Sequence, residues 1–222
     1  GTWVQDATAP AAVGMIAVAD ADHAFAVTTA NETWAWQSGT WSIVGNPHFA
    51  GQQFTSLYVR DAQHVWLSGW RIIQVGGSTC HCGFLLRWQG GSWQTEQAVI
   101  PLYLQAVSIP QDDFGLAVGY EGMPGGATTY KWDGITWTPV TFPGYAFELA
   151  ATSSANAWAI EINSGSLYRY QAGAWSAWPV AGNPIFSALA MTTDTFGVAV
   201  GIFGELRHWN GTAWQTVANP SG

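Results

Sequence analysis

The segments "TYKWDGITW" (residues 129–137) and "LRHWNGTAW" (residues 206–214) carry the strongest structural signal in this chain. In each, an aromatic residue lies five positions before a final Trp, and a Gly stands between them in a short polar set. Gly supplies the positive φ of a tight hairpin turn, and the residues on either side then pair across antiparallel strands. We therefore expect the two aromatic residues of each segment to lie directly opposite each other.

Five segments of the chain share this pattern, and each follows two further short apolar runs. The aromatic pairs are Trp36/Trp41, Trp88/Trp93, Trp132/Trp137, Tyr170/Trp175 and Trp209/Trp214. The first runs occupy residues 15–20, 56–61, 104–109, 148–153 and 188–193, and the second runs occupy residues 24–28, 65–69, 115–119, 157–161 and 197–201. Short turns rich in Asp, Asn, Ser and Thr separate the runs, and none of the runs has a helical period.

Each unit therefore contains four short strands, and the hairpin Trp recurs after 38, 52, 44, 38 and 39 residues, counted from Trp3. Four-stranded units of about 40 residues that repeat around an axis form a β-propeller, whereas the repeats of a β-helical solenoid are much shorter. The sequence predicts an all-β fold, a single five-bladed β-propeller domain of four-stranded antiparallel blades. The blades are expected at about residues 11–45, 52–100, 101–141, 145–180 and 184–218.

An extra N-terminal outer strand is expected at residues 1–5, because Gly1-Thr2-Trp3-Val4 matches the fourth strand at residues 214–217. Two interpretations remain open. The strand either pairs on the last blade and fastens the ring, or it is the remnant of a preceding repeat. We favour the first interpretation because pairing there covers an exposed sheet edge.

Composition argues against several classes of partner. The chain has 222 residues, of which 48% are apolar and 9% charged, and its net charge is −8. A nucleic-acid surface needs clustered Lys and Arg, and an anionic membrane surface attracts basic segments, so neither partner is expected. No run approaches the roughly 18 consecutive apolar residues of a membrane span. The sequence indicates no cofactor.

The repeats resemble those of a known group of proteins. The segments "GLAVGYEG…TTYKWDGITW" and "GVAVGIFGELRHWNGTAW" are similar to bacterial propeller repeats of the form Gly-Trp-Ala-Val-Gly … Asp-Gly-x-x-Trp. Those repeats are related to photosystem II assembly-factor propellers and, more distantly, to sialidase-type Asp-box propellers. The resemblance covers all five units and implies a binding or assembly module of an exported or cell-surface bacterial protein. Only Asp133 and Asn210 stand beside a turn Gly where the other units have Gln, so a strict Asp-box motif is not supported.

One face of the propeller is expected to carry its ligand site. Loops from the second to the third strand, and from the fourth strand to the next blade, open on that face, and loops are where sites are built. Two second-to-third loops are enlarged, at residues 69–83 and 119–129, although neutral insertion would give the same lengths. Three aromatic residues fall just after a second strand, where they either bind a sugar ring or peptide or pack between blades: Trp70, Tyr120 and Phe203. The charged candidates on this face are Arg71, Glu121 and Glu161.

Cys80 and Cys82 are the only cysteines of the chain, and they flank His81. A tight disulfide between them is the favoured interpretation, since an exported chain oxidises its thiols where geometry allows. Two free thiols are the next alternative. A zinc site comes last, because it needs four ligands, so that His64 or His48 would have to join, and its two Cys usually stand further apart.

Catalysis has less support than binding in this sequence. A glycoside hydrolase needs two carboxylates around the channel, and only Glu148 lies near the start of a first strand. Asp20 and Asp61 belong to the opposite face, and no motif frames a nucleophilic Ser, so we assign no catalytic residue. We expect a non-enzymatic recognition or scaffold propeller, extracellular or at the cell surface, that senses a protein, peptide or glycan ligand. A lectin and a glycoside hydrolase are the alternatives, and the unequal loops count against the equivalent pockets of a lectin.

Overall fold

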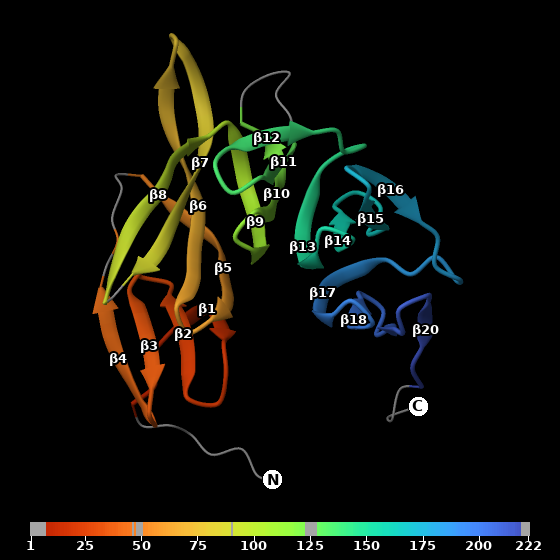
Figure 1. Cartoon of the computed structure of the whole chain (residues 1–222), viewed down its shortest axis with the longest axis horizontal. Helices are drawn as coiled ribbons and strands as arrows, with labels where there is room; N and C mark the ends of the chain where they lie inside the picture. The colour runs from red at the N-terminus through yellow and green to blue at the C-terminus, as the bar shows by residue number, and fades with distance from the viewer. Residues whose placement is uncertain (1–7, 46, 48–50, 90, 123–127, 219–222) are drawn as a thin grey trace.

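The computed structural model describes residues 8–45, 47, 51–89, 91–122 and 128–218. All regular structure within these residues is β-strand, and twenty strands form five antiparallel sheets of four strands each. The four strands of a sheet follow one another in the chain and pair in that order, so each sheet is one propeller blade. Figure 1 shows the blades arranged around a common centre, from blade 1 in red to blade 5 in blue. The prediction of an all-β, five-bladed propeller is confirmed.

The blades have the following strands. Blade 1 contains β1 (Val13–Val18), β2 (His23–Thr28), β3 (Thr33–Gln37) and β4 (Thr40–Gly45). Blade 2 contains β5 (Gln53–Asp61), β6 (His64–Val75), β7 (Ser78–Gln89) and β8 (Ser92–Ile100). Blade 3 contains β9 (Leu102–Gln111), β10 (Phe114–Glu121), β11 (Thr129–Trp132) and β12 (Trp137–Val140). Blade 4 contains β13 (Ala146–Ser153), β14 (Asn156–Glu161), β15 (Leu167–Gln171) and β16 (Ala174–Trp178). Blade 5 contains β17 (Phe186–Thr193), β18 (Phe196–Gly201), β19 (Leu206–Trp209) and β20 (Trp214–Thr216).

The outer hairpin of every blade holds the aromatic pair that the sequence predicts. In all five hairpins the two aromatic residues are direct partners across the strands, with ring centroids 5.3–5.9 Å apart. The turn of blade 1 has positive φ at Ser38 (50°) and Gly39 (89°), which suits the right-handed twist of the two strands. In blade 3 the Asp133 carboxylate accepts the backbone N–H groups of Ile135 and Thr136 instead.

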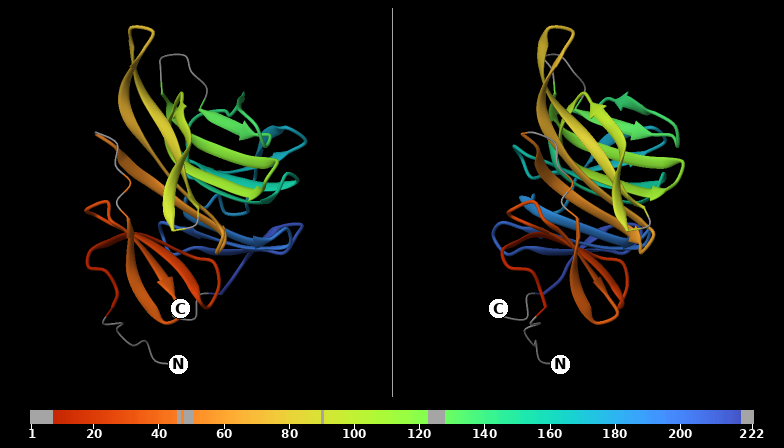
Figure 2. Two further views of the ribbon diagram at one scale, coloured as in Figure 1. Left: turned by 60° about the vertical axis from the view of Figure 1, so that its left-hand side comes forward. Right: turned by 90° about the vertical axis from the view of Figure 1, so that its left-hand side faces the viewer.

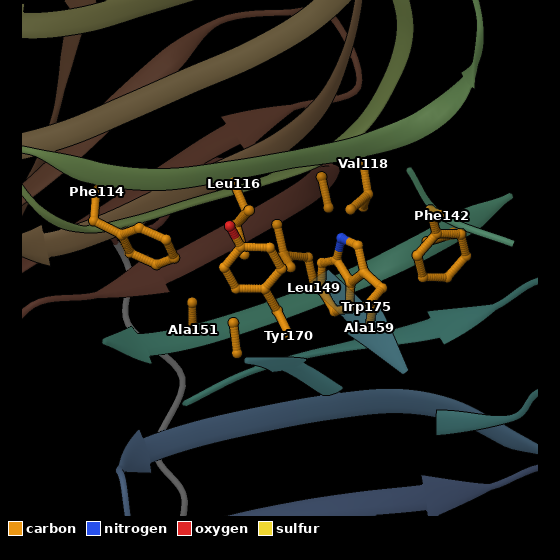
Figure 3. Packing of buried hydrophobic residues seen from close by; sticks show 12 residues of the cluster. Phe114, Leu116, Val118, Phe142, Leu149, Ala151, Ala159, Tyr170 and Trp175 are labelled. Atoms are coloured by element: carbon orange, nitrogen blue, oxygen red, sulfur yellow. The ribbon is translucent and has the colours of Figure 1, made fainter. Parts of the chain in front are cut away.

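Apolar side chains between neighbouring blades form the core. The inner strands β1, β5, β9, β13 and β17 pack against one another in that order. Figure 3 shows the layer between blades 3 and 4, where Leu116 and Val118 lie close to Leu149 and Trp175. Successive side chains of a strand point to opposite faces, so a blade with a neighbour on both sides buries both faces. The strand β14 of blade 4 is accordingly buried at every residue.

Blades 1 and 5 have a packed neighbour on one side. In the described part of the chain, β1 and β17 lack the close packing that joins the other consecutive inner strands. Side chains on the uncovered faces are exposed, at 60% for Ile16 and 65% for Val18 in blade 1 and 47% for Phe196 in blade 5. On the covered face of blade 1, Val27 is only 1% exposed. The described chain is therefore held together mainly by the interfaces between consecutive blades.

The segment at residues 69–83 differs from the enlarged loop expected there. It continues β6 and β7 as a regular antiparallel ladder from Gly69 opposite Phe84 to Val75 opposite Ser78. Gly76 and Gly77, both with positive φ, close this ladder as a two-residue hairpin turn. Figure 2 shows the hairpin, in yellow, projecting beyond the rest of the molecule. The outer strand expected at residues 1–5 lies outside the described residues.

Candidate functional site

The second strand of a blade ends beside the start of the first strand, on the face that the sequence singles out. Trp70 pairs with the first residue of β5, and Tyr120 pairs with Tyr103 of β9. Each follows a glycine, because a bulge in the first strand brings its backbone close at that point. A Cβ would lie 2.0 Å from a carbonyl oxygen of β5 at Gly69, and 2.1 Å from the carbonyl oxygen of Tyr103 at Gly119. This close approach fixes Trp70 and Tyr120 at the same end of adjacent blades.

Five side chains then form a continuous row of rings, which we call the aromatic run: His81, Trp70, Tyr103, Tyr120 and Tyr145. Consecutive ring centroids are 5.6 Å apart for His81 and Trp70, 4.3 Å for Trp70 and Tyr103, 5.5 Å for Tyr103 and Tyr120, and 5.3 Å for Tyr120 and Tyr145. The run begins on β6 and β7 of blade 2, crosses β9 and β10 of blade 3 and ends directly before β13 of blade 4. All five side chains are half-buried, so each ring packs on its neighbours and keeps part of its surface open to a ligand.

Hydrogen bonds to backbone carbonyl groups hold the blades together along the aromatic run. The N–H group of His81 donates to the carbonyl oxygen of Gly122 over 2.8 Å, which joins β7 to the residue after β10. The hydroxyl of Thr128 donates to the carbonyl oxygen of Gly144 over 2.9 Å, close to the last ring of the run. Burial, and then the neighbouring Tyr103, raise the pKa of the Tyr120 hydroxyl, so this group is a hydrogen-bond donor at neutral pH. The Tyr rings of the run thus offer uncharged aromatic surface with polar hydroxyl groups.

Two of the six residues predicted for this face belong to the aromatic run, namely Trp70 and Tyr120. Arg71 and Glu121 follow them on β6 and β10 and pair with Cys82 of β7 and with the first residue of β9. Phe203 is 77% exposed on the turn after β18 in blade 5, two blades beyond the central part of the run. The structure therefore separates Phe203 from the two aromatic candidates that it brings together.

Glu161 stabilises a turn of blade 4. Its side chain is 6% exposed and accepts hydrogen bonds from the backbone N–H groups of Asn163 and Ser164 and from the Ser164 hydroxyl. Burial raises the pKa of Glu161, but these hydrogen bonds outweigh burial and hold the pKa below its ordinary value. The carboxylate is thus charged at neutral pH, and it accepts its hydrogen bonds from residues of the same turn.

Three members of the aromatic run are absent from the ligand-binding residues that the sequence predicts for this face: His81, Tyr103 and Tyr145. The sequence identifies His81 only as a potential zinc ligand beside the two cysteines. Tyr103 and Tyr145 lie at the start of a first strand, and in an antiparallel pair that position adjoins the end of the second strand. The positions of Tyr103 and Tyr145 within their repeats would therefore identify them as residues of this face from the sequence. His81 reaches the run because β6 and β7 continue as a regular hairpin, which the prediction of a loop did not anticipate.

Cys80 and Cys82 form a disulfide on β7, with their Cα atoms 5.1 Å apart. Both side chains are buried, at 0% and 1% exposure. The structure contains no group of three or more metal-binding side chains among its described residues. His64 faces the Asp61 carboxylate over 2.7 Å, and His48 lies outside the described residues.

A cavity of about 410 Å³ lies at the centre, between the inner strands of blades 1 to 4. Its lining includes Met15, Ser56, Gln105 and Glu148. Burial raises the pKa of Glu148 from 4.5 to about 7. Glu148 is the single carboxylate among the described lining residues, so it has no acidic partner there for two-carboxylate hydrolysis.

No family model matches the chain, and no curated protein matches it. Solved structures match it over almost its whole length. A structure of YCF48 bound to D1 peptide has a TM-score of 0.61 and 14% identity, with 93% of this chain and 67% of that chain covered. YCF48 from Cyanidioschyzon merolae has a TM-score of 0.60 and 14% identity, with 95% and 73% covered. The WD40 β-propeller domain of Doa1 has a TM-score of 0.51 and 12% identity, with 94% and 83% covered.

The chain has a propeller fold. The similarity to these structures supports the resemblance to propeller proteins at the level of fold, whereas the repeat motif and its relation to Asp-box proteins have no matching family model. The matches also leave part of each solved chain uncovered, about a third of it in the YCF48 complex. No helix in the described residues is long and apolar enough to cross a membrane.

Proposed function

We propose that this propeller is a non-enzymatic recognition or scaffold module that binds an extended segment of a partner protein along the aromatic run. The observation that carries the proposal is the run itself, with five half-buried rings in contact across neighbouring blades. Tyr and Trp dominate the energetics of protein interfaces because they offer a large apolar area, a polar group and few rotatable bonds. A face with this composition suits a peptide that brings apolar or aromatic side chains.

The linear arrangement of the rings favours an extended peptide. Alternate side chains of an extended strand lie about 7 Å apart on one face. Neighbouring rings of the run are separated by 4.3–5.6 Å, so each side chain of such a peptide would meet one or two rings. Hydroxyl groups of Tyr103, Tyr120 and Tyr145 would supply hydrogen bonds to the peptide backbone. YCF48, which shares the fold at 14% identity, is bound to a D1 peptide in one of the matching structures.

We further propose that the module works outside the cytoplasm, in an exported or cell-surface bacterial protein with a sensing or assembly role. The Cys80–Cys82 disulfide supports an oxidising compartment. The sequence resemblance to exported bacterial propeller repeats supports the same location. This part of the proposal is tested separately from peptide binding by locating the native gene product with an antibody in fractionated cells. Detection at the cell surface or in the medium is expected, and detection in the cytoplasm alone would contradict it.

Peptide binding is testable without knowledge of the natural partner. Random peptides displayed on phage are selected on the wild-type protein, and the enriched peptides are measured by fluorescence anisotropy. Loss of a Tyr at an interface hot spot corresponds to roughly a 10- to 100-fold weaker Kd, so we expect that loss in Tyr120→Ala. Phe203→Ala is the matched control, because it removes an exposed aromatic side chain from blade 5. Absence of enriched peptides, or equal affinity in Tyr120→Ala and wild type, would contradict the proposal.

A further inference from the structure

A second cavity, of about 200 Å³, lies between blades 2 and 3 and does not include the aromatic run. Blade 2 lines it with Trp66 of β6, Arg87 of β7 and Glu96 of β8. Blade 3 lines it with Trp132 and Trp137, the aromatic pair of its outer hairpin. With Asp112 of the turn after β9, the cavity therefore combines three indole rings with one guanidinium group and two carboxylates, within a space several times the roughly 30 Å³ of one water molecule.

The interface between blades 4 and 5 is built from equivalent residues and shows why the cavity exists. Trp158 and Arg169 pair across β14 and β15 as Trp66 and Arg87 pair across β6 and β7. Trp209 and Trp214 occupy the hairpin positions of blade 5. The two interfaces differ at one position of the fourth strand, three residues after the hairpin Trp. Blade 4 has Trp178 there, after Trp175, and blade 2 has Glu96, after Trp93.

Trp178 fills the interface between blades 4 and 5. Its ring centroid lies 5.3 Å from that of Trp158 and 5.6 Å from that of Trp209. The guanidinium group of Arg169 stands 5.4 Å from the centroids of both Trp178 and Trp209. Trp158 and Trp209 are both completely buried. Replacement of this large ring by a carboxylate in blade 2 leaves space, and polar atoms face that space.

Polar groups in the blade 2–3 cavity are partly without partners. The Nε1 atom of Trp66 donates to Oε2 of Glu96, which holds the carboxylate at the interface. The Nε atom of Arg87 and the Nε1 atom of Trp137 are buried and have no hydrogen-bond acceptor among the described residues. The equivalent donors between blades 4 and 5, Nε of Arg169 and Nε1 of Trp214, also have no acceptor among the described residues, but the ring of Trp178 packs into that interface. Arg87 and Trp137 instead line a cavity with room for a partner, and buried N–H donors in proteins nearly always have one.

The charged groups around the cavity are paired with one another. Arg60 pairs with Asp112 over 2.8 Å and with Asp61 over 3.7 Å, and Nη1 of Arg87 lies 3.9 Å from Oε1 of Glu96. A charged ligand would leave one of these groups without compensation in a partly buried space, whereas an uncharged ligand would not. Hydroxyl groups both donate and accept hydrogen bonds, which suits a site that offers donors and an acceptor together.

We propose that the blade 2–3 cavity binds one uncharged pyranose ring, as a terminal or side-chain sugar of a glycan. Its C–H face would pack on the indole of Trp132, and its oxygen atoms would accept hydrogen bonds from Nε of Arg87 and Nε1 of Trp137. One hydroxyl would donate to the carboxylate of Glu96. This site is separate from the proposed peptide surface and from the five equivalent loop pockets that a lectin of this fold would have.

Isothermal titration calorimetry with a panel of uncharged methyl glycosides tests the site. The probes are the α and β methyl glycosides of glucose, galactose, mannose, fucose and N-acetylglucosamine, each titrated to about 50 mM, a range that resolves millimolar Kd values. We expect saturable binding of at least one probe to the wild-type protein. Glu96→Trp copies the residue of blade 4, fills the cavity and should weaken that binding at least tenfold.

Val217→Trp is the matched control, because it adds the same ring at the equivalent position of blade 5 and leaves the blade 2–3 cavity unchanged. Trp137→Phe keeps the aromatic face and removes the free donor, so it tests the site even if Glu96→Trp fails to fold, and it should weaken binding several-fold. Tyr120→Ala, which tests the peptide surface, should leave glycoside binding unchanged. The proposal is overturned if no glycoside binds the wild-type protein, or if Trp137→Phe binds as tightly as wild type.

Discussion

Replacement of Glu148 by Gln should change how the stability of this propeller depends on pH. The Glu148 carboxyl lines the central cavity, and its burial raises its pKa from 4.5 to about 7. Below pH 4.5 the group is neutral in both the folded and the unfolded chain, and its burial then carries no charge penalty. As the pH rises through 4.5 towards 7, the unfolded chain ionises while the folded chain stays protonated. The folded state therefore loses stability over this window, and the loss is complete above the folded pKa.

The size of the effect follows from the two pKa values. One pKa unit corresponds to about 1.4 kcal/mol, so a rise from 4.5 to about 7 corresponds to at most about 3.5 kcal/mol. Because the side chain is only half-buried, residual hydration reduces this figure, and we expect about 1–3 kcal/mol. Glu148→Gln has no ionisable group, so it should match wild type near pH 4.5 and exceed it in stability at pH 8 by that amount.

Urea unfolding followed by Trp fluorescence, at pH 4.5, 6 and 8, measures the free energy of unfolding of both proteins. The difference between the two proteins isolates Glu148, because the other titrating groups are common to both. Gln105→Asn changes a non-ionisable residue that lines the same cavity; it is the control and should give a difference that does not vary with pH in this window. A constant difference between Glu148→Gln and wild type from pH 4.5 to pH 8 would refute the reasoning.

Three further predictions concern packing, each measured by urea unfolding at pH 7. Trp158→Ala removes a fully buried ring between blades 4 and 5 and should cost about 3–5 kcal/mol; a loss below about 1 kcal/mol would contradict that packing. Gly119→Ala puts a Cβ against a carbonyl oxygen at 2.1 Å and should destabilise by about 2 kcal/mol or more. Gly14→Ala, whose nearest contact would be 3.6 Å, should have little effect, and equal effects would refute the close approach. Val18→Ala on the uncovered face of blade 1 should cost less than about 0.5 kcal/mol, whereas Val27→Ala on the covered face should cost about 2 kcal/mol; similar costs would mean that both faces are covered.

The sequence contains much of the fold because the decisive interactions within a blade are local. Trp36 and Trp41 are direct partners because five positions around a short turn allow one antiparallel register, and the same holds for the other four hairpins. The hairpin at residues 69–83 follows the same rule, since its Gly76-Gly77 turn and alternating strands were present in the sequence. The prediction of a loop there is wrong because the length of the insertion does not distinguish a loop from a hairpin, whereas the Gly76-Gly77 turn does.

The candidate site was predictable in part. Trp70 and Tyr120 were identified from their place after a second strand, because position within a repeat specifies the face on which a residue lies. Their contact through Tyr103, with a ring centroid 4.3 Å from that of Trp70, depends on how blade 3 packs on blade 2. Phe203 occupies a comparable position in its own repeat but lies on blade 5, outside the run. Repeat position alone therefore does not specify which equivalent residues meet.

The sequence by itself determined the unit of this protein, a four-stranded blade closed by an aromatic hairpin, and the number of such units. It also shows Glu96 where the repeat of blade 4 has Trp178. Only the tertiary structure decided that this exchange opens a cavity and that the aromatic run crosses from blade to blade. It also decided that side chains on the uncovered faces of blades 1 and 5 are exposed in the described residues. The physical reason is how far apart in the sequence the interacting residues lie. Strand register and turns depend on neighbouring residues, whereas cavities, rows of rings and exposed faces depend on how whole sheets pack against one another.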